Sequence, residues 1–206
     1  MMKTKVISSD QKEAINLAIE VLNKSGIVAF PTDTVYGVGA LVRDEKAIKK
    51  LFFAKGRDFN KAIAVLIGEK DQLKQLTTNF NIPARKLAER FWPGGLTLVV
   101  EKAVELPRIL SPLLTIGIRM PDHIFTRKLL LESGPLATTS ANISGFDNSL
   151  SAKDVLDQLD GKIDLLIDGG KSPGGTPSTV VDCTKEKPKI IRVGAISEEE
   201  IQETLS

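Results

Sequence analysis

Short, continuous apolar runs bounded by glycine or proline recur along this chain, and they constrain its fold more than any other feature. Residues 27–30 (IVAF), between Gly26 and Pro31, form one such run. A run of this kind is typical of a strand that is buried on both faces. We expect further strands at residues 62–67, 96–100, 115–119, 136–139, 163–167, 178–182 and 190–193.

Amphipathic segments separate most of these runs. Asp10 precedes apolar residues at helical spacing as far as Leu22, and Asp44 is a candidate cap for a helix that ends near Phe53. We expect further helices at residues 71–76, 83–91, 122–131, 152–159 and 198–205. No helix separates the strands between residues 96 and 119, which favours a mixed sheet. With no linker long enough to divide the chain, we expect one α/β domain over residues 1–206.

Hydroxyl, amide and cationic side chains cluster where several predicted strands end. Side chains alternate along an extended backbone, so Thr115 and Arg119 share one face of their strand. Two more cations, Lys55 and Arg57, lie two residues apart. Such groups together suit a polyanion, with phosphate the leading candidate, and they predict an anion-handling enzyme. The polar residues in question are Thr32, Thr115, Arg119, Thr138, Ser140 and Asn142.

Composition excludes several classes of protein. The 28 basic and 26 acidic residues give a net charge of +2, too even to identify a nucleic-acid binder. The single Cys183 and single His123 exclude an internal disulfide and a cysteine or multi-histidine metal cluster. No apolar stretch approaches the roughly 18 residues of a membrane span, and the start of the chain lacks a signal-peptide core. We therefore expect a soluble, cytoplasmic protein without a metal cluster.

Three familiar motifs fail on inspection. Residues 169–172 (GGKS) resemble the end of a P-loop, but the required first glycine falls on Leu165 and Pro173 follows at once. Residues 37–39 (GVG) begin like a dinucleotide fingerprint, yet its third glycine position holds Val42. Ser140 lacks the flanking glycines of a nucleophile elbow. His123 is better explained as a helix cap or a surface residue, and residues 169–177 as a flexible lid or turn.

Five segments taken together resemble the Sua5/YrdC/YwlC family of threonylcarbamoyl-AMP synthases, in order and spacing, from about Val6 to Ile196. The chain ends soon after Gly194, so it is similar to the family's short form without an additional C-terminal domain. The segments are FPTDTVYG (30–37), KGR (55–57), WPGGLT (92–97), GIRMP (117–121) and SAN (140–142).

The resemblance implies a YrdC-like fold, with a twisted mixed sheet around a large electropositive cavity. It implies synthesis of threonylcarbamoyl-AMP from L-threonine, bicarbonate and ATP, with release of pyrophosphate and with Mg²⁺ on the ATP. The product would feed threonylcarbamoyladenosine modification of tRNA, completed by a separate threonylcarbamoyl-transferase complex, and direct contact with tRNA or double-stranded RNA is possible. The sequence contains no recognisable set of protein ligands for this metal ion.

The resemblance also assigns roles to residues. Lys55 and Arg57 match the Lys-x-Arg element, which would hold the ATP phosphates and the carbamate and serve as the catalytic pair. The positions that match threonine contacts are Thr32, Arg119, Thr138 and Ser178, and those that match further ATP contacts are Thr115, Ser140, Asn142 and Arg192.

The chain departs from the family pattern at two positions. Asp58 and Ala62 replace prolines that the family often has, and Asp58 could partly neutralise Arg57 if their side chains meet. Taken alone, Lys55 and Arg57 would also fit an ordinary solvated helix end.

Two other functions also fit the sequence. One is an RNA-binding module whose basic cavity holds tRNA or double-stranded RNA without nucleotide chemistry. The other is a carbamoyl-transfer domain of the kind found in larger hydrogenase-maturation proteins.

Overall fold

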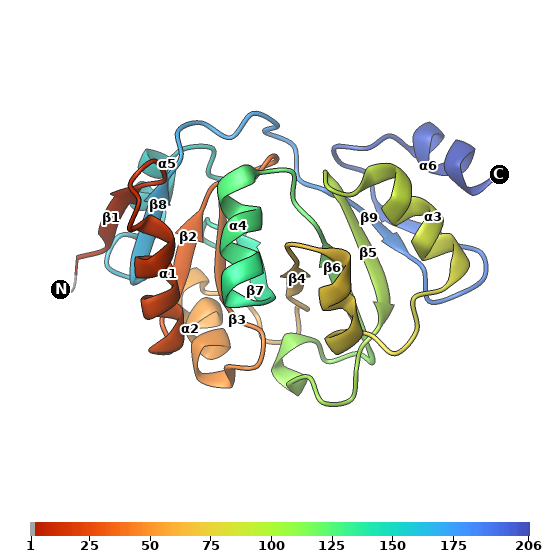
Figure 1. Ribbon diagram of the computed structural model, residues 1–206, viewed down its shortest axis with the longest axis horizontal. Helices are drawn as coiled ribbons and strands as arrows, with labels where there is room; N and C mark the ends of the chain where they lie inside the picture. Colours follow the sequence, from red (N-terminus) through yellow and green to blue (C-terminus); the bar gives the residue numbers. More distant parts are fainter. Residues whose placement is uncertain (1–2) are drawn as a thin grey trace.

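A single mixed sheet organises the molecule, whose structure, a computed structural model, describes residues 3–206. Helices separate most, but not all, of the strands along the chain (Figure 1). In chain order they are β1 (Lys5–Ser8), α1 (Ala14–Asn23), β2 (Val28–Phe30), β3 (Gly37–Leu41), α2 (Glu45–Lys55), β4 (Ala64–Leu66), η1 (Lys70–Gln75), α3 (Ile82–Phe91), β5 (Leu96–Glu101), η2 (Arg108–Leu110), β6 (Thr115–Arg119), α4 (Ile124–Ser133), β7 (Leu136–Ser140), α5 (Ala152–Leu159), β8 (Leu165–Asp168), β9 (Thr179–Asp182), β10 (Lys189–Arg192) and α6 (Glu198–Leu205).

Parallel and antiparallel pairs are mixed throughout the sheet. The ten strands run in the order β1-β8-β2-β3-β7-β4-β6-β5-β9-β10. Strand β8 is parallel to both β1 and β2, whereas β7 is antiparallel to both β3 and β4. Strands β5 and β6 form an antiparallel pair without an intervening α-helix. The expected mixed α/β fold is confirmed.

Strands β2 and β8 are buried on both faces of the sheet. In β2, Val28 and Phe30 join a core formed with α1 and α4, while Ala29 between them joins the larger core on the other face. Strand β8 divides in the same way, with Leu166 on the larger-core side and its neighbours on the other. Alternating side chains of one apolar run therefore supply two cores, which is why such runs lack a polar face.

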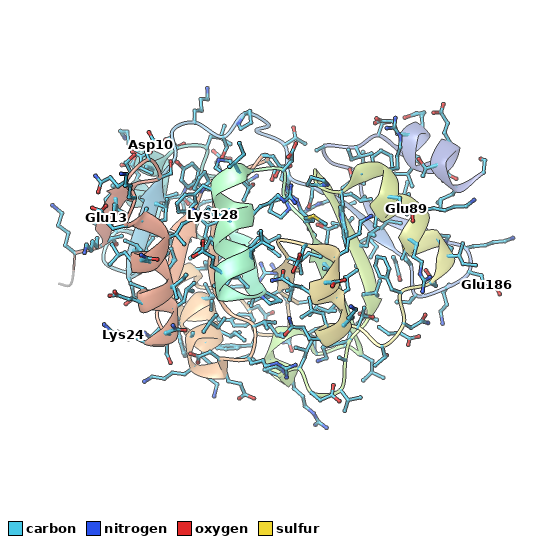
Figure 2. The ribbon with its side chains drawn as sticks, viewed as in Figure 1. Asp10, Glu13, Lys24, Glu89, Lys128 and Glu186 are labelled. Atoms are coloured by element: carbon cyan, nitrogen blue, oxygen red, sulfur yellow. The ribbon has the colours of Figure 1, made fainter. Side chains whose placement is uncertain are left out.

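Helices cover the sheet at both ends of the molecule. Figure 1 shows α1 beside α4, and α3 beside α6 at the opposite end, and these pairs are in contact. Figure 2 shows charged side chains on the outer surface, and those that it labels are exposed: Asp10, Glu13, Lys24, Glu89, Lys128 and Glu186. None of the helices within residues 3–206 combines the length and apolarity needed to cross a membrane.

Capping residues set several helix boundaries as their sequence predicts. The Asp44 carboxylate accepts a hydrogen bond from the Ala47 amide at 2.9 Å and so begins α2. Gly56 ends this helix in the left-handed conformation, with φ of 56°. His123 accepts from the Thr126 amide and caps α4. This cap agrees with the prediction that His123 is a helix cap or a surface residue.

Two strands and one helix type differ from the sequence predictions. Strand β1 was not predicted because it lies at the edge of the sheet and buries only Ile7 among its residues. Strand β3 was not predicted because glycine is uncommon in strands, yet Gly37 and Gly39 lie against Phe30 and Thr138, where a side chain would crowd both. The helix expected at residues 71–76 is the 3₁₀ helix η1.

Candidate active site

A cavity of about 360 Å³ lies where the middle of the sheet meets its β9–β10 end. Strands β3, β4, β5, β6, β7, β9 and β10 contribute to its wall, together with the loops after β2 and α2. Its volume falls within the range of small-molecule sites, roughly 300–1,000 Å³. The lining includes three arginines and several hydroxyl groups but neither aspartate nor glutamate.

Most of the predicted site residues gather on this cavity although they are distant in sequence. Seven of the ten line it: Thr32, Arg57, Arg119, Thr138, Ser140, Ser178 and Arg192. The other three, Lys55, Asn142 and Thr115, lie outside the lining. The expectation that the hydroxyl-bearing strand ends and Arg57 converge is therefore correct as geometry, and the chemical role of each residue stays a prediction.

Arg57 and Arg192 supply positive charge without a carboxylate partner in the described part of the chain. Arg57 Nη2 donates to the Ala62 carbonyl at 2.8 Å, while its buried Nε has no acceptor. Arg192 donates from Nη2 to the Ser178 carbonyl at 2.7 Å. Burial lowers the pKa of both guanidinium groups, yet arginine stays charged in proteins. Both cations are thus available to an anion in the cavity.

Asp58 does not form an ion pair with Arg57. Its carboxylate accepts from the Asn60 amide at 2.9 Å and so closes its own loop. No ion pair joins the two residues within the described chain, although the negative charge of Asp58 opposes the burial effect on the pKa of Arg57. The concern that Asp58 would neutralise Arg57 by direct contact is not supported by the geometry.

Arg119 differs from the other two arginines because it already has a carboxylate partner. Its Nη2 donates to Asp33 Oδ1 at 2.5 Å, its Nη1 to Thr34 Oγ1 at 2.8 Å and its Nε to the Gly94 carbonyl at 2.9 Å. Burial lowers the pKa of Arg119, and the charge of Asp33 opposes that change. The guanidinium is therefore fixed in place and largely neutralised by its partner.

Lys55 is not on the cavity surface, contrary to the prediction that it would meet substrate phosphates beside Arg57. Its side chain is buried, with 2% of its surface exposed. The ammonium donates to the carbonyls of Ser140 and Asn142 and, at 3.3 Å, to Asn142 Oδ1. Burial lowers the pKa of Lys55 to about 7, and the charge of Arg57 acts in the same direction. In this arrangement Lys55 holds the turn after β7 rather than a ligand.

Asn142 and Thr115 lie outside the lining for different reasons. The Asn142 amide donates to the Ile143 and Phe146 carbonyls and accepts from Lys55, so it belongs to the same turn. Thr115 begins β6 opposite Glu101, at the far end of the strand from Arg119. Gly117 and Arg119 do line the cavity. The alternation argument identified the correct face of β6, but the cavity ends before Thr115.

Sequence reasoning missed several residues of the site. Thr97 Oγ1 and Ser178 Oγ are 2.8 Å apart on the cavity wall, and Thr34 binds Arg119. Thr97 could have been found, because it is the one hydroxyl in an apolar strand and its two neighbours are buried on the opposite side. Asp33 had no such signal, since one acidic residue between two threonines fits an ordinary turn.

Residues 169–177 cross from β8 to β9 above the sheet, as the arching segment in Figure 1 shows. The Tyr36 hydroxyl donates to the Gly170 carbonyl at 2.7 Å and accepts from the Gly169 amide at 3.1 Å. The Gly175 amide donates to the Thr34 carbonyl at 2.9 Å. Pro177, at its end, lines the cavity. We call this segment the strap. Backbone contacts therefore anchor it near both ends, and whether it moves as a flexible lid or stays a turn remains a prediction.

Comparisons with known proteins agree with this architecture. The Sua5_yciO_yrdC family model, described as "Telomere recombination", matches residues 20–194. The chain belongs to the Sua5_yciO_yrdC family. It is 42% identical over 193 residues to the threonylcarbamoyl-AMP synthase of Pyrococcus abyssi and 41% identical over 188 residues to that of Bacillus subtilis. These matches cover 93% and 90% of this chain but 57% and 54% of the relatives, so the chain spans about half their length.

The fold of this Sua5_yciO_yrdC family member matches a solved relative closely. The crystal structure of P. abyssi Sua5 complexed with L-threonine superimposes with a TM-score of 0.93 at 39% sequence identity. The match covers 98% of this chain and 61% of that one. The cavity described above thus belongs to a fold that binds threonine in a relative.

The cavity of this family member does not contain the ligands of a resident metal. Within residues 3–206, no group of three or more histidine, cysteine, aspartate or glutamate side chains is arranged to hold an ion. Carboxylates, which magnesium prefers, are missing from the cavity lining.

Proposed function

We propose that this chain is a nucleotidyltransferase that forms threonylcarbamoyl-AMP from L-threonine, bicarbonate and ATP. The observation that carries the proposal is a cavity lined by arginines and hydroxyl groups, without a carboxylate, in a fold whose relative was solved with L-threonine. The curated relatives that bear the synthase name share about two fifths of their aligned residues with it. The chain spans about half the length of those relatives, so its own activity has to be measured.

The proposed chemistry brings several anions into one place. The threonine amine attacks bicarbonate, water leaves, and a carbamate forms. A carbamate oxygen then attacks the α-phosphorus of ATP, and the bond to pyrophosphate breaks. The negative charge that builds on phosphorus must be offset by fixed cations, and the unpaired Arg57 and Arg192 meet that need.

We assign the residues by their environment. Arg57, Ser140 and Arg192 would contact the ATP phosphates, and Thr32, Arg119, Thr138 and Ser178 would bind threonine. Lys55 and Asn142 support the turn that carries Ser140, and Thr115 lies outside the proposed site. With no nucleophile or metal cluster needed from the protein, catalysis rests on positioning and electrostatics. MgATP is the proposed substrate form.

In the cell, the product would serve tRNA threonylcarbamoyladenosine formation. It is a mixed anhydride that a separate transferase would have to consume, and this role would place the protein in the cytoplasm. An RNA-binding module fits less well, because a cavity of about 360 Å³ suits a small molecule better than a duplex.

The test is pyrophosphate release by the purified chain. We expect release only when threonine, bicarbonate and MgATP are all present, and we expect mass spectrometry to show threonylcarbamoyl-AMP. Omitting each substrate in turn is the control. Absence of ATP turnover with all three would refute the proposal. Tight RNA binding with a steep salt dependence and no ATP binding would instead support the RNA-binding alternative.

A further inference from the structure

The three arginines of the cavity are not electrostatically equivalent. Arg57 and Arg192 lie without a carboxylate partner among the described residues, whereas Arg119 is paired with Asp33. The side chains of this pair are 8% and 16% exposed. The two charges are opposite and in direct contact, so together they present a net charge close to zero to a ligand a few ångströms away.

The strap packs against the backbone of the loop that carries Asp33. The strap residue Gly174 packs so closely on the loop after β2 that a Cβ atom there would lie 2.6 Å from the Asp33 carbonyl oxygen. The adjacent Gly175 amide donates to the Thr34 carbonyl at 2.9 Å. Asp33 itself is not on the cavity lining, while Arg119 is. The carboxylate therefore lies outside the lining, and its charge reaches a ligand in the cavity together with that of the Arg119 guanidinium.

Arg119 keeps some donor capacity in spite of this pairing. A guanidinium has five N–H groups, and three of those of Arg119 donate to Gly94, Thr34 and Asp33. In the described structure the remaining two have no protein acceptor. Two such donors can bind a carboxylate by hydrogen bonds, but the neutralised pair offers little attraction for a multiply charged phosphate.

We propose that Asp33 is a specificity-determining residue, which neutralises Arg119 so that this part of the cavity accepts an amino-acid carboxylate and rejects phosphate. The unpaired Arg57 and Arg192 would then hold the polyanion in the same cavity. The amino-acid ligand rests on the proposed function, whereas the exclusion of phosphate depends only on the charges described here.

The experiment measures binding of inorganic pyrophosphate and of threonine by titration calorimetry. In Asp33→Asn the shape of the side chain is kept and its charge is lost, so we expect pyrophosphate affinity to rise about tenfold. Pyrophosphate should then compete with threonine. Asp157→Asn is the matched control, because it removes the same charge from an exposed ion pair with Lys153, and its pyrophosphate affinity should equal that of the wild type.

A second variant is needed in case Asp33→Asn misfolds, because that substitution leaves a buried cation without a partner. The double variant Asp33→Asn with Arg119→Gln removes both charges and leaves the net charge of the cavity unchanged. Its pyrophosphate affinity should match the wild type within about twofold, and circular dichroism should show an unchanged fold.

Either of two results would overturn the proposal. One is an unchanged pyrophosphate affinity in a folded Asp33→Asn variant. The other is a tenfold loss of that affinity in the double variant, which would show that Arg119 acts as a full cation in the wild type. A wild-type chain that makes no threonylcarbamoyl-AMP would refute the proposed function alone, since the pyrophosphate measurements still decide the role of Asp33.

Discussion

Two cations that are neighbours in the sequence have opposite environments in the structure. Lys55 ends α2 with its ammonium surrounded by oxygens of residues 140 and 142, whereas Arg57, past the Gly56 turn, reaches the cavity. The left-handed glycine changes the direction of the backbone between them, and one side chain turns into the protein while the other lines the cavity. The same motif therefore contains a structural cation and a candidate catalytic one.

Alanine substitutions should separate these two roles. Arg57→Ala should lower kcat/KM for pyrophosphate release by about 100-fold, because the proposed contact of a cation with the reacting phosphates is lost, with little change in the melting temperature. Lys55→Ala should lower the free energy of unfolding by about 1–3 kcal/mol, since buried carbonyls lose their donor. Assays of pyrophosphate release and urea unfolding of both variants measure the two effects.

The matched control for both is Lys61→Ala, an exposed cation in the loop after α2. It should alter neither property. If Lys55→Ala kept full stability and lost activity, Lys55 would be a ligand-binding residue, and the contacts of its ammonium would have to break during turnover.

At the level of elements, the strap joins the two ends of the sheet through few contacts. Tyr36 sits at the first end, where its hydroxyl bridges the Gly169 amide and the Gly170 carbonyl. Burial raises the pKa of Tyr36, so this hydroxyl keeps its proton at neutral pH. The bridge orders the strap before it reaches Thr34 and Asp33, which connects a core tyrosine to the cavity wall.

Tyr36→Phe should loosen the strap while the sheet stays intact. We expect a loss of about 1 kcal/mol in unfolding free energy, because one side-chain hydroxyl and its backbone partners lose their hydrogen bonds. Amide hydrogen exchange at Gly169 should become at least about fivefold faster. The Cys183 amide, bonded to the Val99 carbonyl at 2.9 Å, is the internal control and should not change. Unchanged exchange at Gly169 would show that other contacts hold the strap.

For the whole molecule, the sequence predicted the sheet strands with apolar runs and the convergence of polar strand ends. It did not predict β3, because the reason for Gly37 and Gly39 in that strand is their close approach to Phe30, which is a tertiary contact. Nor could it predict that Lys55 is buried, since that depends on carbonyls of a turn some 85 residues away in the chain. Local sequence patterns predict which residues are buried and how they repeat along a helix or strand. Which residues then contact each other depends on the tertiary structure.

The charge arrangement of the whole cavity predicts different salt dependences for its two proposed ligands. ATP would meet Arg57 and Arg192, whose charges are unpaired, so its Kd should rise about tenfold between 0.05 and 0.5 M NaCl as screening increases. Threonine is a zwitterion that would meet the neutralised pair of Arg119 and Asp33, so its Kd should change by less than about twofold. Calorimetric titrations at four salt concentrations measure both values, and Arg57→Ala should flatten the ATP dependence because one unpaired cation is removed. Equal slopes for the two ligands would mean that the cavity acts as one undivided positive field, and the division between amino-acid and phosphate regions would then be wrong.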